Sequence, residues 1–251
     1  MLEKRLIPVL LIQNRKLVKS IKFKKHNYLG DPINAVKIFS TKTVNELIVV
    51  DIEASRKSKI DMDYLYMIAD ECFIPLTYCG GVDNLKQMEE IYKIGFEKIA
   101  IDSALFSNRD LLENAIKEFG SSSIVVSITI KKDLFGRYKI YDYVRNSFRK
   151  QSFFEFLNYV QTMDPGEIFL NNASYDGLMV GYDRAFVKSI APNIQVPFTV
   201  CGGAGEIKDA YDILSLNEVT GAAAGSIFVY SSRNKGIMIN YPNSSGTSIF
   251  S

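Results

Sequence analysis

The sequence contains no tryptophan and only one histidine, which narrows the chemistry available to it. Any mechanism that needs an imidazole base would have to use His26, because histidine is the side chain whose ordinary pKa lies near neutral pH. Catalytic zinc sites rely largely on histidine ligands, so we expect no metal, and we expect no cofactor. His26 itself lies in a lysine-rich stretch, residues 19–26, whose composition is typical of an exposed loop.

Cysteine is also scarce. Cys72, Cys79 and Cys201 neither pair evenly nor show the C-x-x-C spacing of a metal site, so they are predicted to be reduced thiols rather than a disulfide framework. The N-terminal apolar run, residues 6–12, is too short for a membrane span and lacks the small-residue cleavage site of a signal peptide. We therefore expect a cytoplasmic protein.

Charge of one sign is not in excess either. The chain has 30 basic and 28 acidic residues and a formal net charge of +2, which argues against a dedicated partnership with nucleic acid or a membrane. At 251 residues and 47% hydrophobic composition, it is long enough to bury one large core or two modest ones.

Short β-branched runs recur along the chain and alternate with segments of helical periodicity. Eight such runs are predicted as strands: residues 5–11, 46–51, 74–78, 98–102, 123–129, 167–172, 196–200 and 219–225. Apolar strands that alternate with helices indicate a parallel sheet, and eight units in about 250 residues favour a (β/α)8 TIM barrel. An open doubly wound α/β sheet is the alternative fold.

A similar strand-and-turn sequence occurs twice: IPLTYCGG at residues 74–81 and VPFTVCGG at residues 196–203. The repeat predicts a two-fold duplication within a single domain, residues 1–251, with half-barrels at about 1–120 and 121–230 and an extended or mobile tail at 231–251. Glycine turns followed by a helix can bind phosphate through backbone N–H groups. They can equally be tight turns that require positive φ.

Several motifs together resemble the HisF family, the cyclase subunit of imidazole glycerol phosphate synthase. They are the N-terminal MLEKRLIPVLLIQNRKLVKS, GDP at 30–32, LIVVDIEAS at 47–55, the two CGG strands and YDGLMVGYD at 175–183. The resemblance, over about residues 1–230, implies a half-barrel-duplicated barrel that binds a substrate with a phosphate at each end. It also implies a glutaminase subunit that docks at the N-terminal face and sends ammonia through the barrel.

The resemblance assigns phosphate-binding positions to both halves. They are Gly81 and Ser103 in the first half, and Asp176, Gly177, Gly203, Gly225 and Ser226 in the second. Asp102 stands where the family has an asparagine. A carboxylate beside a phosphate would repel it, so the first-half site is expected to be the weaker one.

The catalytic positions depart further from the family. Its two aspartates, which act as acid and base, are replaced by Leu11 and Thr129, neither of which exchanges a proton at neutral pH. Asp51 and Lys19, also at the barrel mouth in the family, are retained as candidate catalytic residues. Asp51 could alternatively cap the turn that follows its strand.

Four charged residues stand at the starts of predicted strands and match the family's ammonia gate: Arg5, Glu46, Lys98 and Glu167. Spacing alone would instead make them solvated strand starts. Because the ring is kept and the two aspartates are lost, the resemblance favours a protein that conducts ammonia from a glutaminase to an acceptor reaction. We expect a bulky residue at Val49, on the second strand, to block that central passage.

The C-terminal end, GIMINYPNSSGTSIFS, lacks the family's closing helix and resembles a HisF-like branch linked to surface-polysaccharide synthesis. That branch implies ammonia supply to an N-acetyl sugar amidotransferase, with a phosphorylated or sugar molecule as ligand. One alternative is a genuine cyclase that forms imidazole glycerol phosphate and AICAR, with Asp51 or Asp102 as replacement acid and base. The other is a non-catalytic scaffold that binds a phosphate sugar.

Overall fold

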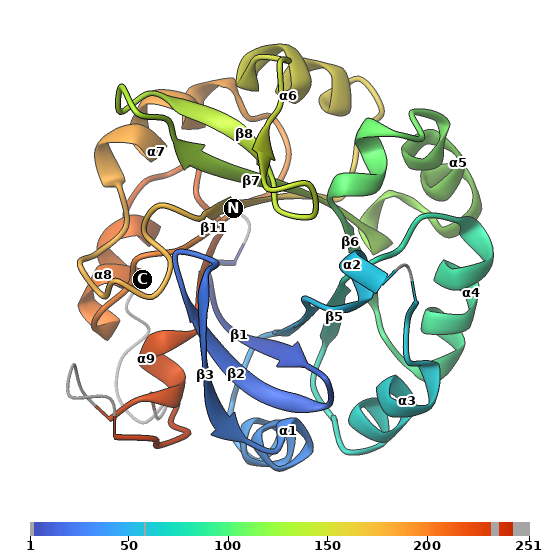
Figure 1. The fold of residues 1–251 in the computed structure, drawn as a ribbon, viewed down its shortest axis with the longest axis vertical. Coiled ribbons are helices and arrows are strands. Elements are labelled where there is room, and N and C mark those ends of the chain that lie inside the picture. Colours follow the sequence, from blue (N-terminus) through green and yellow to red (C-terminus); the bar gives the residue numbers. More distant parts are fainter. Residues whose placement is uncertain (1–2, 58, 232–235, 243–251) are drawn as a thin grey trace.

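The computed structural model describes residues 3–57, 59–231 and 236–242, and its centre is a closed barrel of parallel strands surrounded by helices (Figure 1). The barrel strands are β1 Arg5–Gln13, β4 Leu47–Asp51, β5 Leu76–Cys79, β6 Lys98–Ile101, β7 Ile124–Lys132, β10 Glu167–Asn172, β11 Phe198–Cys201 and β12 Gly221–Ala224. Pairing of β10 with β7 and of β12 with β1 closes the ring. The (β/α)8 prediction is confirmed, and the open-sheet alternative is wrong.

Helices follow most barrel strands and form the outer layer (Figure 1). They are α1 Pro32–Ser40, α2 Ala54–Lys57, α3 Met62–Asp70, α4 Leu85–Ile94, α5 Asp110–Phe119, α6 Phe153–Gln161, α7 Arg184–Ile190, α8 Ile207–Leu214 and α9 Ser226–Val229, with 3-10 turns η1 Ser103–Phe106, η2 Ser121–Ser123 and η3 Ala191–Asn193. Local signals explain their ends: a capping box of Ser152 and Glu155 starts α6, and Gly95 with φ 120° ends α4. Among the described residues, no helix is long and apolar enough to cross a bilayer.

Two antiparallel hairpins extend from the barrel and were not predicted. The first is formed by β2 Lys16–Ile21 and β3 Lys25–Gly30, and β2 also pairs with the end of β1. The second is formed by β8 Tyr138–Asp142, which pairs with β7, and β9 Ser147–Phe148. The lysine-rich stretch is therefore a hairpin rather than a loop, and His26 is half-buried at its edge instead of fully exposed.

Alternating side chains divide the core into two parts. The larger part lies between the strands and the helices, and it holds large side chains such as Phe39 and Phe156. The smaller part fills the barrel interior with Ile7, Val9, Ile48, Ala100, Val125, Phe169, Cys201 and Ala223. Successive residues of a strand point to opposite faces, so Val49 lies in the outer core and its neighbour Ile48 in the interior. The expectation that Val49 faces the passage is wrong.

The chain beyond α9 turns back along that helix. Tyr230 forms an antiparallel bridge with Ile237, and the backbone N–H groups of Met238 and Asn240 donate to Val229 and Phe228. Residues 236–242 form neither a helix nor a longer strand. The remainder of the predicted tail, at 232–235 and 243–251, lies outside the described residues.

Candidate functional site

A cavity opens at the carboxyl ends of the barrel strands, where catalytic and binding residues of such barrels lie. Leu11 of β1 and Thr129 of β7 both line it, as do Asp51 at the end of β4 and Asp102 after β6. Val50, Cys79 and Phe169 form part of its floor and also contact the apolar interior. The mouth cavity therefore lies directly above the barrel interior.

Asp102 is the carboxylate most closely associated with Thr129. Ser127 Oγ and Thr129 Oγ1 donate to the same carboxylate oxygen, at 2.8 and 2.9 Å. Burial raises the pKa of Asp102 to about 6, against the opposing effect of these two hydroxyl donors. The mouth therefore keeps an ionisable group although Thr129 stands where the family has an aspartate. The Thr129 hydroxyl donates to Asp102, whose pKa is raised to about 6.

Asp51 lines the same cavity and also caps the turn after β4. One of its oxygens accepts the backbone N–H groups of Glu53 and Ala54, each at 3.0 Å. Burial raises the pKa of Asp51, and the two backbone donors oppose that shift. The capping alternative is thus present in the structure, and the catalytic assignment of Asp51 stays a prediction.

Lys19 does not line the mouth cavity as the resemblance led us to expect. Its buried Nζ lies 2.6 Å from Asp176 Oδ1 and donates to the Ser20 carbonyl at 3.0 Å. The other Asp176 oxygen accepts the Ser20 hydroxyl and, at 3.2 Å, the Phe23 N–H. Asp176 therefore fastens the β2–β3 hairpin over the barrel, and its role in phosphate binding stays a prediction.

Two of the remaining second-half phosphate positions, Gly177 and Gly225, lie beside this buried pair. A Cβ at Gly177 would lie 2.2 Å from the Ser20 carbonyl oxygen, and one at Gly225 would lie 3.1 Å from Cε of Lys19. Ser226 follows Gly225 and is buried. Gly203 is placed separately, against Gly181, at the turn after β11. The structure thus brings a lysine to the second-half positions, which sequence spacing could not reveal.

The first-half positions, Gly81 and Ser103, line a second hollow beside the mouth cavity. The Gly81 N–H donates to Ser55 Oγ at 2.9 Å, so this backbone donor already has a partner. Arg145 and Arg149 of the β8–β9 hairpin line the same hollow, and sequence reasoning missed both. Alternating apolar and polar residues in RYKIYDYV, residues 137–144, were the signal that could have revealed the hairpin.

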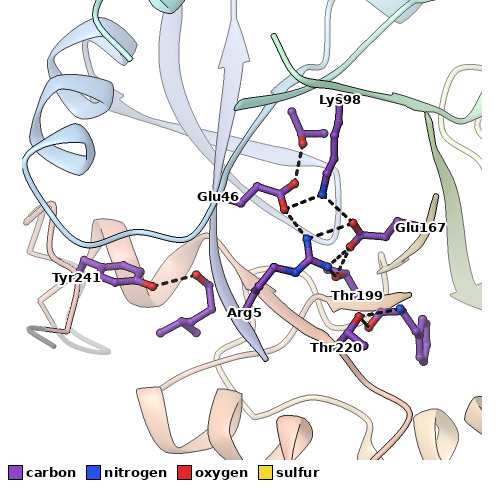
Figure 2. Close-up of polar contacts among 10 residues, drawn as sticks. Arg5, Glu46, Lys98, Glu167, Thr199, Thr220 and Tyr241 are labelled. Carbon is purple, nitrogen blue, oxygen red and sulfur yellow. Dashed lines mark hydrogen bonds and ion pairs between the residues drawn. The ribbon is translucent and has the colours of Figure 1, made fainter. Parts of the chain in front are cut away.

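The four predicted gate residues meet at the opposite, N-terminal end of the barrel (Figure 2). Arg5 pairs with both Glu46 and Glu167, the latter at 2.8 Å. Lys98 Nζ lies 3.0 Å from Glu46 and 3.1 Å from Glu167. Glu46 and Glu167 are only 3% and 5% exposed, so the interpretation as solvated strand starts is wrong.

Hydroxyl groups complete this charged ring, which we define as Arg5, Glu46, Lys98 and Glu167. Thr77 Oγ1 donates to Glu46 at 2.6 Å, and Thr199 Oγ1 donates to Glu167 (Figure 2). Burial raises the pKa of Glu167, but Arg5 and Lys98 outweigh that effect and hold it below its ordinary value. The ring is a closed network whose two cations and two anions balance.

Comparisons with known proteins agree with this architecture. A family model described as "Histidine biosynthesis protein" matches residues 5–234. The chain is 43% identical over 249 residues to "Putative imidazole glycerol phosphate synthase subunit hisF3" of Vibrio vulnificus, covering 98% of this chain and 95% of that protein. It is 39% identical over 244 residues to "Putative imidazole glycerol phosphate synthase subunit hisF2" of Pseudomonas aeruginosa, covering 97% of each.

A further relative is the "Imidazole glycerol phosphate synthase subunit HisF" of Petrotoga mobilis, at 35% identity over 233 residues and 92% of each chain. The matches extend over nearly the whole barrel and agree with its eight parallel strands. The chain therefore belongs to the HisF family of imidazole glycerol phosphate synthase subunits.

Proposed function

We propose that this protein is the synthase-type subunit of a glutamine amidotransferase complex and carries ammonia from a glutaminase to an acceptor at the barrel mouth. The observation that carries the proposal is the balanced charged ring, which lies at one end of an apolar barrel interior with the mouth cavity at the other. The interior includes the small side chains of Ala100, Ala223 and Cys201. They would obstruct the passage of ammonia less than larger side chains at these positions.

The electrostatics of the ring suit a small neutral molecule. Every charge of the ring has two opposite partners, and both glutamates accept an additional hydroxyl. A satisfied network leaves no net charge to trap a polar neutral molecule, whereas an ion entering the apolar interior would lose its hydration at a cost of several kcal/mol or more. Ammonia fits these conditions and ammonium does not.

The proposed ammonia source is a glutaminase subunit docked at the N-terminal face, where the charged ring lies. The relatives are named as subunits of imidazole glycerol phosphate synthase, which supports a protein that works with another chain. Docking at this face would place the glutaminase product at the ring without release into solvent.

The proposed acceptor is an N-acetyl sugar, held with a separate sugar amidotransferase and amidinated for surface-polysaccharide synthesis. Leu11 and Thr129 at the mouth support an acceptor other than the family's cyclase substrate, because neither side chain exchanges a proton near pH 7. The mouth cavity supports a small-molecule ligand at this end of the barrel, which we propose to be a phosphorylated or sugar molecule.

Obstructing the interior tests conduction. Ala223→Phe places a bulky side chain among the interior residues, and we expect it to abolish product formation from glutamine in the reconstituted complex. The same variant supplied with an ammonium salt should keep most of its activity, which controls for folding and acceptor binding. Full glutamine-dependent activity in a folded Ala223→Phe protein would reject conduction and favour a scaffold that only docks partners.

One observation favours a second candidate, a cyclase with rearranged acid and base. Asp102 and Asp51 line the same cavity, and burial raises the pKa of both, that of Asp102 to about 6. In this case, ammonia-dependent formation of imidazole glycerol phosphate would occur in the wild type and fall about 10²-fold or more in Asp102→Asn and Asp51→Asn. Unchanged turnover in both variants would count against the cyclase.

A further inference from the structure

A groove between the β7–β8 hairpin and the start of α6 has no part in the mouth cavity or in the proposed ammonia route. β8 and α6 both line it, and Figure 1 shows these two elements next to each other. None of its lining residues lines the mouth cavity. The hairpin extends from the carboxyl end of β7, so the groove lies toward the mouth end of the barrel and away from the charged ring.

One edge of β8 is open along this groove. β8 pairs with β7 through residues 138–140, but on its other side it pairs with β9 only at Tyr141 and Asp142. Tyr138 and Lys139 line the groove and have no strand partner on that side among the described residues. An unpaired strand edge offers backbone groups with which another extended polypeptide can pair.

A row of aromatic rings forms the apolar part of the groove. The rings of Tyr138 and Phe186 have their centres 4.1 Å apart, and Phe153 lies 6.1 Å from Phe186. Phe154 lies 5.4 Å from Phe153 and is 47% exposed. Exposed aromatic side chains beside a groove are typical of surfaces that bind another protein.

The polar part of the groove is positively charged. Its lining contains no carboxylate and four cations: Arg137, Lys139, Arg149 and Lys150. The carboxylates nearest to these cations, Asp133 and Asp142, each pair with two basic side chains. Glu155 of α6 accepts the Ser152 N–H and does not line the groove. Lys150 is exposed and forms no ion pair with another described residue.

The strand register adds to this positive charge. Lys139 stands directly opposite Lys131 of β7. Like charges in directly opposed positions of two strands repel each other. Lys131 Nζ lies over the Tyr141 ring, 4.0 Å from its centre, and Lys139 shares Asp133 with Arg137. A carboxylate bound beside Lys139 would therefore offset an existing repulsion.

We infer that this groove binds an extended acidic segment of a partner protein, which adds a strand to the open edge of β8. Alternate side chains of a strand point to opposite faces, so apolar ones would pack on the aromatic row while acidic ones meet Lys139 and Lys150. Nucleic acid and anionic lipid could use the charge, but only a polypeptide continues the backbone pairing. Naming the acceptor enzyme as the partner rests on the proposed function, whereas strand addition does not.

The probe is a short fluorescent peptide of alternating glutamate and valine, titrated with the full-length protein and followed by fluorescence anisotropy. We expect saturable binding that weakens as salt is added. Lys150→Glu should weaken it about tenfold or more, because a repulsion replaces an attraction. Lys117→Glu is the matched control, since Lys117 lies on α5, is 69% exposed and changes the net charge equally. It should bind as the wild type does.

Two further comparisons test the apolar and backbone parts of the groove. Phe154→Ala should weaken binding, whereas Phe135→Ala should not, because Phe135 is 81% exposed on the same hairpin and does not line the groove. The same peptide with N-methyl groups on alternate residues cannot pair as a strand on that side. It should bind about tenfold more weakly or worse, although its charge is unchanged.

The inference is overturned if the wild type shows no saturable binding up to about 1 mM peptide. Equal binding by Lys150→Glu and Lys117→Glu, or by the plain and the N-methylated peptide, would overturn it too. Tighter binding of single-stranded RNA or of phosphatidylglycerol vesicles would show a different kind of partner. The titration needs neither glutaminase nor ammonia, so its failure is distinguishable from failure of the Ala223→Phe test.

A competition experiment tests whether the partner is the acceptor enzyme. Saturating peptide should lower glutamine-dependent product formation in the reconstituted complex, and the N-methylated peptide should not. Unchanged product formation with the groove saturated would overturn the assignment of the groove to the acceptor enzyme.

Discussion

The role assigned to Asp102 changes once its neighbours in the structure are known. From the sequence it was a charge that would repel phosphate in the first half of the barrel. In the structure its carboxylate receives two hydroxyl groups from β7 and lies in the mouth cavity, while two arginines line the adjoining hollow. The residue therefore belongs with the candidate proton-exchanging groups rather than with the predicted first-half phosphate positions.

The raised pKa of Asp102 predicts a pH-dependent effect on stability. An ordinary aspartate titrates near 4, and Asp102 titrates at about 6 in the fold, so the folded protein holds this proton more tightly than the unfolded chain does. The free-energy cost of ionising Asp102 in the folded protein therefore increases as the pH rises from about 4 to about 6. Between pH 4 and pH 7.5, the free energy of unfolding of Asp102→Asn should therefore rise by roughly 2–3 kcal/mol relative to that of the wild type.

Urea unfolding of both proteins at the two pH values measures this difference. The asparagine side-chain oxygen can still accept the Ser127 and Thr129 hydroxyls, so the comparison isolates the charge. A stability difference that does not change with pH would show that Asp102 ionises normally in the fold.

At the same scale, the charged ring was predictable and the Lys19–Asp176 pair was not. Ring members stand at the starts of strands, and the starts of parallel barrel strands must lie at one end, so their positions in the sequence placed them together. Lys19 and Asp176 are 157 positions apart, and their contact depends on how the first hairpin folds over the barrel. No periodicity in the sequence encodes that orientation.

Among the elements, the two glycine turns explain the repeated CGG. A Cβ at Gly80 would lie 2.6 Å from the Asp51 carbonyl oxygen, and one at Gly202 would lie 2.7 Å from that of Asn172. Each turn thus presses its first glycine against the end of the neighbouring strand, with φ of 154° and 104°. The repetition reflects a steric requirement of the fold, whether or not phosphate binds.

A comparison of Gly203 with Gly120 separates this steric requirement from the preference of positive φ for glycine. Gly203 and Gly120 both have left-handed φ, 118° and 84°, but a Cβ at Gly203 would lie 2.1 Å from the Gly181 carbonyl oxygen and one at Gly120 meets nothing within 4 Å. We expect Gly120→Ala to cost about 1 kcal/mol of unfolding free energy. Gly203→Ala should cost several times more, about 3 kcal/mol or above.

Thermal or urea unfolding of the two variants measures the contrast. Equal losses would mean that the turn after β11 shifts easily, and that Gly203 is retained for another reason, such as close approach of a ligand.

The β2–β3 hairpin was missed because its turn, and the turn that leads into it from β1, lack the usual signal. Asn14 and Arg15, between β1 and β2, have φ of 50° and 59°, and Lys22 and Phe23, between β2 and β3, have 51° and 59°, so both turns place two consecutive residues in the left-handed region. Such turns normally carry Asn-Gly or Asp-Gly, and neither pair does so here. All eight barrel strands were predictable because they are buried on both faces, but half-exposed strands among lysines gave a weaker pattern.

At the scale of the whole molecule, the segment 236–242 contacts the first barrel strand. Tyr241 is buried and stacks on Phe228 of α9. Its hydroxyl donates to the Leu6 carbonyl at 3.0 Å, and Figure 2 shows this hydrogen bond of Tyr241. Leu6 follows the ring residue Arg5 on β1. The segment 236–242 therefore packs on the foot of the barrel.

Tyr241→Ala should be markedly destabilising. It removes a buried aromatic ring and a hydrogen bond over 235 positions of sequence, which together predict a loss of about 3–5 kcal/mol. Met238→Ala is the control from the same segment, because Met238 is 46% exposed and should cost about 1 kcal/mol or less. Similar losses in the two variants would indicate that Tyr241 does not anchor the segment in solution.

An ion would have to lose its hydration to pass through the apolar interior from one end of the barrel to the other. Under the proposed conduction, a proton would not accompany nitrogen along this axis as ammonium without leaving water, because the interior cluster consists of apolar side chains and the Cys201 thiol, with the Cys79 thiol packed against it. Nitrogen that travels this way reaches the mouth as a free base, and the proton balance of the acceptor reaction must be settled there. On the proposed function, a neutral molecule would therefore pass between the two ends of the barrel without carrying a proton from one end to the other.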